Sequence, residues 1–164
     1  EAMKVYDEGL TTFEHNTDLL YARALTAEKV DRLDILERDL KFILQHEPND
    51  VQTLNALGYT LIDRTERYQE GFELIERAHQ LRPDDVAILD SMGWALYRLG
   101  RLDEALAYLK RAAARLRDGE IAAHLGEVLW VSGKRKEANH VWEEALKFAP
   151  DNQILQQTLQ RLKP

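Results

Sequence analysis

Only a few residues of this 164-residue chain have the types and spacing that catalysis or metal binding would require. Asp90 and Glu127 could act as an acid–base pair of carboxylates, but acidic side chains that line a surface are more often solvated or contact a ligand. The histidines show no ligand spacing such as His-Glu-x-x-His, and we expect surface or inter-helix polar roles for them. They are His15, His46, His79, His124 and His140. The sequence therefore predicts no catalytic residue, no metal site and no cofactor.

The glycines and the basic residues do not indicate a phosphate or nucleic-acid site. Gly58, Gly93 and Gly126 fall inside predicted helices, where they serve close helix contact and open no phosphate-binding loop. The run Lys134-Arg135-Lys136 lies in a predicted turn and is too short for nucleic acid. With 22 basic and 29 acidic residues, the net charge of -7 argues against nucleic acid and anionic membranes as partners.

The composition is that of a folded protein without a membrane span. Apolar residues make up 45% of the chain and charged residues 31%, which argues against disorder. No apolar run approaches the ~20 residues of a membrane-spanning helix, and no signal peptide is recognisable. The chain has no cysteine, which excludes disulfides, thiolate zinc sites and cysteine nucleophiles but leaves the compartment open.

The helices that would position any site are clearest in residues 86–118. Apolar and small side chains form one helical stripe before Gly100 and a second stripe after it, so two amphipathic helices fold back on each other. The first stripe comprises Leu89, Met92, Gly93 and Leu96, and the second comprises Leu102, Ala105, Leu106, Leu109 and Ala112. The small residues allow close helix contact, and Ala105→Leu should overpack it at a cost of about 1–3 kcal/mol or more.

The same pattern recurs along the chain. Gly93, Gly100, Ala105 and Ala112 reappear 33 residues later as Gly126, Gly133, Ala138 and Ala145. In the other direction, Gly58 precedes Gly93 by 35 residues and Ala78 precedes Ala112 by 34. A helix-turn-helix unit repeated at about 34 residues is typical of a solenoid.

The repeated residues resemble the tetratricopeptide-repeat (TPR) family. One unit reads Leu54, Leu57-Gly58, Leu61, Gly71, Ile75, Ala78, Pro83, and another reads Ala122, Leu125-Gly126, Leu129, Ala138, Trp142, Ala145, Pro150. The resemblance implies an all-α fold, a right-handed α-solenoid of antiparallel helix pairs closed by a C-terminal capping helix. It also implies a scaffold that binds other proteins or peptides.

We divide the chain into six parts. Residues 1–16 are interpreted as helix B of a truncated repeat, 17–50 as a degenerate repeat, 51–85, 86–118 and 119–152 as repeats, and 153–164 as the capping helix. In the degenerate repeat, Ala24 and Asp31 replace the usual glycines. We interpret the chain as a fragment of a longer solenoid, whose exposed first helix could self-associate, either as an artefact of the cut or as a native interface.

The concave surface is the predicted binding site. Its lining, read from the first helix of each repeat, is Asn55, Tyr59, Ile62, Asp90, Trp94, Tyr97, His124, Glu127 and Trp130. Partly exposed aromatic side chains favour binding, so Trp94→Ala should weaken partner capture more than it destabilises the fold. The alternative is that Tyr97, Trp130 and also Trp94 are structural and pack against the next repeat.

The TPR resemblance also suggests a clamp of lysine, asparagine and arginine that holds a partner's C-terminal carboxylate. The corresponding positions here are Asn55, Ala87, Asp90, Ser91 and Glu120. Only Asn55 fits such a clamp, and the two acids would repel a carboxylate. The sequence therefore predicts that the clamp is absent.

Three segments resemble a narrower group, the C-terminal repeats of Gram-negative TPR lipoproteins tethered to the outer membrane on its periplasmic side. They are Leu54–Gly71, Ile88–Arg101 and Glu120–Trp130. Proteins of this kind are adaptors for envelope enzymes, including carboxy-terminal processing proteases that act on cell-wall hydrolases. The resemblance implies a non-enzymatic periplasmic adaptor, with no membrane insertion by these residues. Two alternatives remain open: a structural self-assembly module, and a cytosolic co-chaperone or regulatory adaptor.

Overall fold

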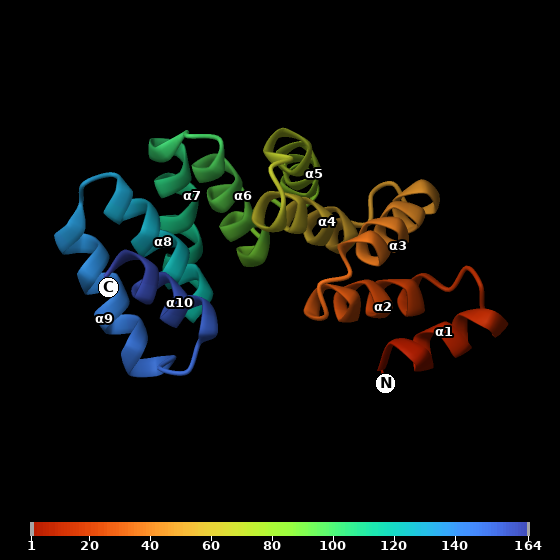
Figure 1. Ribbon diagram of the computed structural model, residues 1–164. Coiled ribbons are helices and arrows are strands. Elements are labelled where there is room, and N and C mark those ends of the chain that lie inside the picture. The colour runs from red at the N-terminus through yellow and green to blue at the C-terminus, as the bar shows by residue number, and fades with distance from the viewer. Residues whose placement is uncertain (1, 164) are drawn as a thin grey trace.

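The computed structural model describes residues 2–163, which form ten α-helices and contain no β-strand (Figure 1). The helices are α1 (Ala2–Thr12), α2 (Thr17–Lys29), α3 (Leu33–His46), α4 (Val51–Arg64), α5 (Tyr68–Leu81), α6 (Val86–Arg98), α7 (Leu102–Arg115), α8 (Gly119–Val131), α9 (Arg135–Phe148) and α10 (Gln153–Leu162). Within these residues, no helix is long and apolar enough to cross a membrane.

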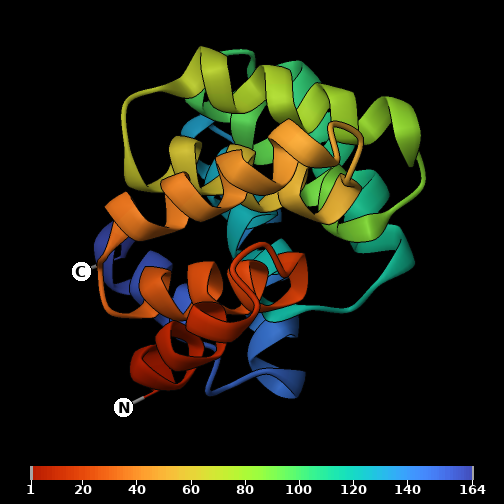
Figure 2. The same cartoon turned by 90° about the vertical axis from the view of Figure 1, so that its right-hand side faces the viewer.

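Successive helices pair as antiparallel hairpins, α2 with α3, α4 with α5, α6 with α7 and α8 with α9. We call the first helix of each pair the A helix and the second the B helix. The A helices α4, α6 and α8 also contact one another in series, and α10 continues this row against α8. The hairpins follow one another from α1 to α10 in Figure 1, and the view along the row shows them rotated relative to one another (Figure 2).

Each A helix, and α10, begins at an Asp or Asn whose side chain accepts a hydrogen bond from a backbone N–H of the first turn. The capping residues are Asn16, Asp50, Asp85, Asp118 and Asn152. The B helices follow a basic residue that makes no such bond. Because an uncapped helix leaves its first N–H groups without partners, these short polar residues define where each repeat begins.

Positive backbone φ angles end three of the four A helices. Gly100 and Gly133 have φ angles of 78° and 80°, and Asp31 takes the equivalent place in the first hairpin with a φ angle of 58°. Aspartate tolerates this left-handed conformation better than most residues, so the replacement of glycine keeps the turn.

Glycine allows the two helices of a hairpin to approach closely. A Cβ atom at Gly58 would lie 2.8 Å from the carbonyl oxygen of Gly71, and a Cβ atom at Gly71 would lie 2.6 Å from that of Gly58. In the last hairpin, a Cβ atom at Gly126 would overlap the buried indole of Trp142. These distances explain why small residues recur at these positions.

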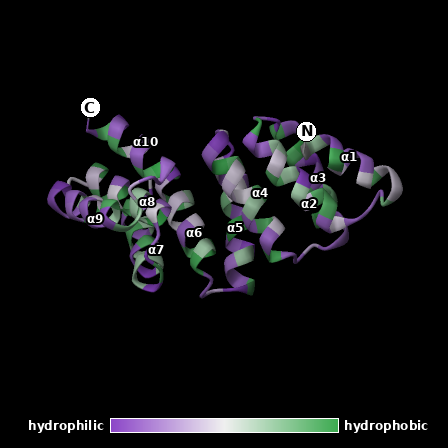
Figure 3. Ribbon diagram, turned by 90° about the horizontal axis from the view of Figure 1, so that it is seen from below, coloured by the Kyte–Doolittle hydropathy of each residue, from purple (hydrophilic) through white to green (hydrophobic). Residues whose placement is uncertain are grey.

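Two large apolar clusters form the core, together with a small third cluster of Leu89, Ala112 and Ile121. One extends from Leu10 to Leu61 and the other from Val51 to Leu155, and the half-buried Leu44 and Leu74 contact both. Most helices accordingly show hydrophobic and hydrophilic residues on different sides (Figure 3). The core is therefore continuous from one hairpin to the next, as a solenoid requires.

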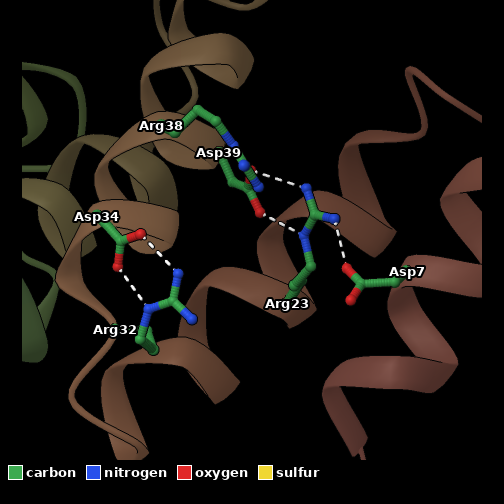
Figure 4. Close-up of polar contacts among 6 residues, drawn as sticks. All are labelled: Asp7, Arg23, Arg32, Asp34, Arg38 and Asp39. Atoms are coloured by element: carbon green, nitrogen blue, oxygen red, sulfur yellow. Dashed lines mark hydrogen bonds and ion pairs between the residues drawn. The ribbon is translucent and has the colours of Figure 1, made fainter.

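The first helices are joined by ion pairs. Arg23 of α2 donates to both carboxylate oxygens of Asp39 on α3, at 2.7 and 2.9 Å, and to Asp7 on α1 at 2.7 Å (Figure 4). Asp39 is buried and also accepts from Arg38. The side chains of Val5 on α1 and of Phe13, which directly follows α1, are each 62% exposed.

Candidate functional site

The predicted lining of the concave surface is mostly covered by neighbouring repeats. Four of the nine predicted residues keep partial exposure, namely Asn55, Tyr59, Tyr97 and Trp130. The other five are buried: Ile62, Asp90, Trp94, His124 and Glu127. The prediction of exposed lining residues is therefore wrong for these five, because residues about one repeat apart on adjacent A helices contact each other.

Trp94 is the clearest correction. Its side chain is only 7% exposed, and its ring stacks on His124 of the next A helix, with 4.2 Å between ring centroids and 20° between the ring planes. The indole N–H donates to Asp63 at 3.2 Å. Trp94 thus joins three consecutive repeats and is not free to serve as an anchor for a partner.

Tyr97 and Trp130 follow the structural alternative. The Tyr97 hydroxyl donates to Glu127 at 3.0 Å, and burial together with that carboxylate raises the pKa of Tyr97 to about 12. The Trp130 ring lies 5.7 Å from that of Trp142 and carries the Arg135 guanidinium at 4.9 Å. Both aromatic side chains therefore stabilise contacts between helices.

Four of the polar residues form one connected network across three A helices. His124 Nδ1 donates to Asp90 Oδ2 at 2.9 Å, and the Tyr59 hydroxyl donates to Glu120 Oε1 at 2.8 Å while lying 3.4 Å from His124 Nε2. Burial raises the pKa of Tyr59 and that of Glu120. Burial alone would lower the pKa of His124, but the carboxylates of Asp90, Glu120 and Asp63 together raise it, and the net direction is upward.

A hollow of about 350 Å³ opens beside this network, between α2, α4, α6 and α8. It is lined by Leu25, Glu28, Asn55, Ala56, Tyr59, Thr60, Val86, Ala87, Asp90, Ser91, Leu116, Asp118, Glu120 and Ile121. Four of these described residues are acidic and none is lysine or arginine. The five positions that correspond to the carboxylate clamp all line this hollow. The hollow is therefore acidic, whereas a site that binds a carboxylate would be basic.

Two buried oxygen atoms at the hollow have no hydrogen-bond donor among the described residues. They are Asn55 Oδ1 and Asp90 Oδ1. An unpaired buried acceptor costs about 1–3 kcal/mol, and more when it is charged. The pair of acceptors therefore favours a ligand that donates hydrogen bonds.

The structure also brings together three groups that could bind a metal ion, which the linear spacing did not predict. Possible ligand atoms of Asp90, Glu120 and His124 all lie within 4.8 Å of one another. Asp90 and His124 are 34 residues apart, so only the repeat period could have signalled their meeting. The Asp90 carboxylate is bound to Nδ1, on the opposite side of the ring from the Nε2 atom that faces Tyr59. A hydrogen-bonded histidine–carboxylate pair describes this geometry better than a metal centre.

Sequence reasoning missed Glu28 and Asp118 at the hollow. Glu28 accepts from Thr60 at 3.2 Å, and Asp118 caps α8. The Asp118 cap was recognisable in principle from its place before a predicted helix. Nothing in the sequence indicated that the end of α2 lines the same hollow as α4 and α6.

Comparison with known proteins identifies the repeats. Residues 49–118 match the family described as tetratricopeptide repeat. Residues 49–118 therefore contain tetratricopeptide repeats. A TPR repeat-containing protein of Pseudomonas aeruginosa is 52% identical over 127 residues, which cover 77% of this chain and 22% of that protein. The chain therefore spans less than a quarter of this relative.

Solved TPR structures share the fold. A thermophilic TPR protein of Thermus thermophilus superposes with a TM-score of 0.83 at 21% identity, covering 98% of this chain and 88% of that one. MamA from Desulfovibrio magneticus RS-1 has a TM-score of 0.74 at 14% identity, with coverages of 92% and 85%. The predicted all-α TPR solenoid is confirmed. TPR domains bind proteins or peptides and are generally non-enzymatic scaffolds, so this chain is consistent with an interaction scaffold.

Proposed function

We propose that this chain is a non-enzymatic, periplasmic adaptor that binds envelope proteins, such as a processing protease and its substrates, through the concave TPR surface. The observation that carries the proposal is the acidic hollow between α2, α4, α6 and α8, an open part of the surface that the A helices line. A site shared by the A helices of four successive hairpins suits an extended partner better than a small metabolite.

The contacts of the two candidate carboxylates support a binding role over catalysis. Asp90 is bound to His124, and Glu127 is bound to Tyr97 and to Arg161 of α10. Each carboxylate therefore has its own local partners, and the two do not form an acid–base pair. The proposal of a periplasmic location rests on the resemblance of three segments to outer-membrane TPR lipoproteins.

The binding role can be tested by replacing either of two exposed alanines with arginine. Ala87 is exposed on α6 and lines the hollow, whereas Ala107 is exposed on α7 and does not. We expect Ala87→Arg to block the hollow and abolish capture of partners from a Gram-negative envelope extract, while Ala107→Arg captures them as the unchanged chain does. A captured partner should then bind the purified chain directly. Equal capture by all three proteins, or no direct binding, would contradict the proposed site.

The location can be tested by fractionation of cells that express the full-length protein. We expect this segment to be cleaved by protease added to spheroplasts, with a cytosolic marker intact. Protection until the inner membrane is lysed would contradict the periplasmic location and favour the cytosolic adaptor.

Self-assembly is a second candidate because two large apolar side chains are exposed at the start of the chain, Val5 on α1 and Phe13 directly after it. Exposed apolar surface of this kind favours association. A chain that forms oligomers through α1 and captures no partner at the hollow would support a structural module over an adaptor.

A further inference from the structure

We propose that the hollow binds the side-chain ammonium or guanidinium group of a lysine or arginine from the partner protein. This inference rests on the proposed function and specifies what the partner must present. The geometry points to Asp90 Oδ1 and Asn55 Oδ1 as the atoms that accept hydrogen bonds from the cation, because both are buried at the hollow without a donor among the described residues.

Asp90 differs from the other buried carboxylates of the described chain. Asp39 is held by Arg23 and Arg38, and Glu127 receives Arg161 at both of its oxygens. Asp90 is only 7% exposed, yet its one charged partner is His124, which binds Oδ2 and leaves Oδ1 without a donor. The buried carboxylates of Asp39 and Glu127 each receive a guanidinium from the chain, whereas Asp90 receives neither a guanidinium nor an ammonium group from the described residues.

The charge around Asp90 is strongly one-sided. Glu28 of α2, Asp118 before α8 and Glu120 of α8 also line the hollow, and no lysine or arginine does so among the described residues. His124 is the basic group in contact with these carboxylates, and protonated it would supply one positive charge. A cation from a partner would offset the remaining repulsion among the acids.

The remaining lining favours a side chain over a bare ion. Apolar side chains of Leu25, Val86, Leu116 and Ile121 border the same hollow as the acceptors. Lysine and arginine place a long apolar stem behind a charged head, so they match a site with acceptors at one part and apolar walls at another. A metal ion would leave these walls uncovered.

The proposal can be tested by NMR titration of the isotope-labelled chain with three small probes. Nα-acetyl-lysine amide and Nα-acetyl-arginine amide carry the cation, and Nα-acetyl-norleucine amide is the neutral control. With at least one cationic probe, we expect saturable chemical-shift changes of the Asn55 side-chain amide and of the Trp94 indole N–H, with a dissociation constant of about 1 mM. With norleucine amide we expect no such changes. Equal shifts with norleucine amide would overturn the proposal, since binding would then need no charge.

Substitutions locate the charge that matters. Asp90→Asn should weaken binding of the cationic probe about tenfold or more, whereas Glu143→Gln, an exposed acid on α9 away from the hollow, should leave it unchanged. Asp118→Asn retains a side chain that can cap α8, so it tests the charge even if Asp90→Asn disturbs folding. Unchanged affinity in Asp118→Asn and in a folded Asp90→Asn chain would overturn the proposal. So would saturation by ZnCl₂ without binding of either cationic amide.

The probe titration and the capture experiment separate the two proposals. Capture that depends on the hollow, with no binding of either cationic amide, would overturn the cation inference and leave the adaptor proposal intact. Binding of a cationic amide with no hollow-dependent capture would support the cation site and overturn the adaptor proposal.

Discussion

Three of the thirteen residues of α2 are buried, whereas ten of the thirteen residues of α8 are buried. Both are A helices at equivalent places in their repeats. Helix α8 packs against α6, α7, α9 and α10, while α2 packs mainly against α1 and α3. The number of neighbours, and not the repeat motif, decides how much of an A helix becomes core.

The two regions also use different interactions. Around α2, the guanidinium of Arg23 connects three helices through carboxylates (Figure 4). Around α8, stacked rings and hydrogen bonds from tyrosine hydroxyls connect the A helices, as in the pair of Trp94 and His124. The Arg23–Asp39 pair is largely buried, so the cost of desolvating both charges offsets much of their attraction, whereas buried aromatic contacts contribute through area and dispersion. The comparison predicts that substitutions around α8 destabilise more than their counterparts around α2.

The largest expected effect is that of Trp94→Ala, in the well-covered region. Loss of this buried ring should lower the free energy of unfolding by about 3–5 kcal/mol. Tyr21→Ala on α2, where the ring is only half-buried, should have a clearly smaller effect. Urea denaturation followed by circular dichroism measures both. Equal losses of stability in the two variants would contradict the claim that the number of neighbouring helices decides how much a side chain contributes.

A reciprocal exchange of glycine and alanine comes next. Gly126→Ala should destabilise the fold by about 1–3 kcal/mol despite the better helix propensity of alanine, because the new methyl group meets the Trp142 indole. Ala24→Gly at the equivalent site of α2 should cost about 1 kcal/mol, mainly from helix propensity. Thermal unfolding of the two variants provides the measurement. If Gly126→Ala stabilised the fold, α8 and α9 would have to move apart enough to accommodate the new methyl group beside Trp142.

Removal of the arginine that joins the first helices tests the ion pairs. Arg23→Met should lower stability by about 1–2 kcal/mol, because Asp39 stays buried with Arg38 as its remaining partner. The double variant Arg23→Met/Asp39→Leu removes the buried charge as well and should recover most of the loss. A double variant that is less stable than Arg23→Met would contradict this explanation.

The buried histidine predicts a pH dependence in the α8 region. The folded state raises the pKa of His124 above its ordinary value of 6.5. Its contribution to stability is therefore fully present below pH 6.5 and is lost as pH rises through the raised value, by at most about 1.4 kcal/mol per pH unit. In the His124→Gln variant, the urea denaturation midpoint should depend less on pH above pH 6.5 than in the unchanged chain. The raised pKa of Glu120 acts in the same direction but begins near pH 4.5, so the two windows differ.

The smallest effect on stability is expected at α1 and the residue that follows it. Val5→Ser with Phe13→Ser should change the free energy of unfolding by about 0.5 kcal/mol or less, since both side chains are exposed. The same double variant should abolish any self-association of the chain in light scattering. Oligomers that persist in the variant would place the association surface elsewhere.

Much of the fold was predictable because it depends on local patterns. The stripes around Gly93 and Gly126 predicted paired helices, and the recurring small residues predicted a solenoid, which the resemblance to the TPR family specified further. Asp31 was recognised in the place of a turn glycine, and it takes the positive φ angle that the turn needs. These features depend on backbone geometry and on side-chain size within one repeat.

The site was predictable only in part. The A-helix positions around Asn55, Tyr59 and Asp90 were identified, and the hollow lies there. The burial of Trp94 and Glu127 was not identified, because each meets residues of other repeats. How far those repeats rotate determines whether a side chain faces solvent or its neighbour, and the repeat period does not encode that rotation.

The sequence by itself determined the helix pairs, the polar caps that start the A helices, the acidic character of the concave positions and the absence of a carboxylate clamp. Tertiary structure decided which of those side chains are used between repeats and which acceptors at Asn55 and Asp90 remain without a donor. The physical reason is distance. Helix formation depends on neighbours three and four residues apart, whereas a hydrogen bond between repeats depends on differences of less than 1 Å between residues about 34 positions apart.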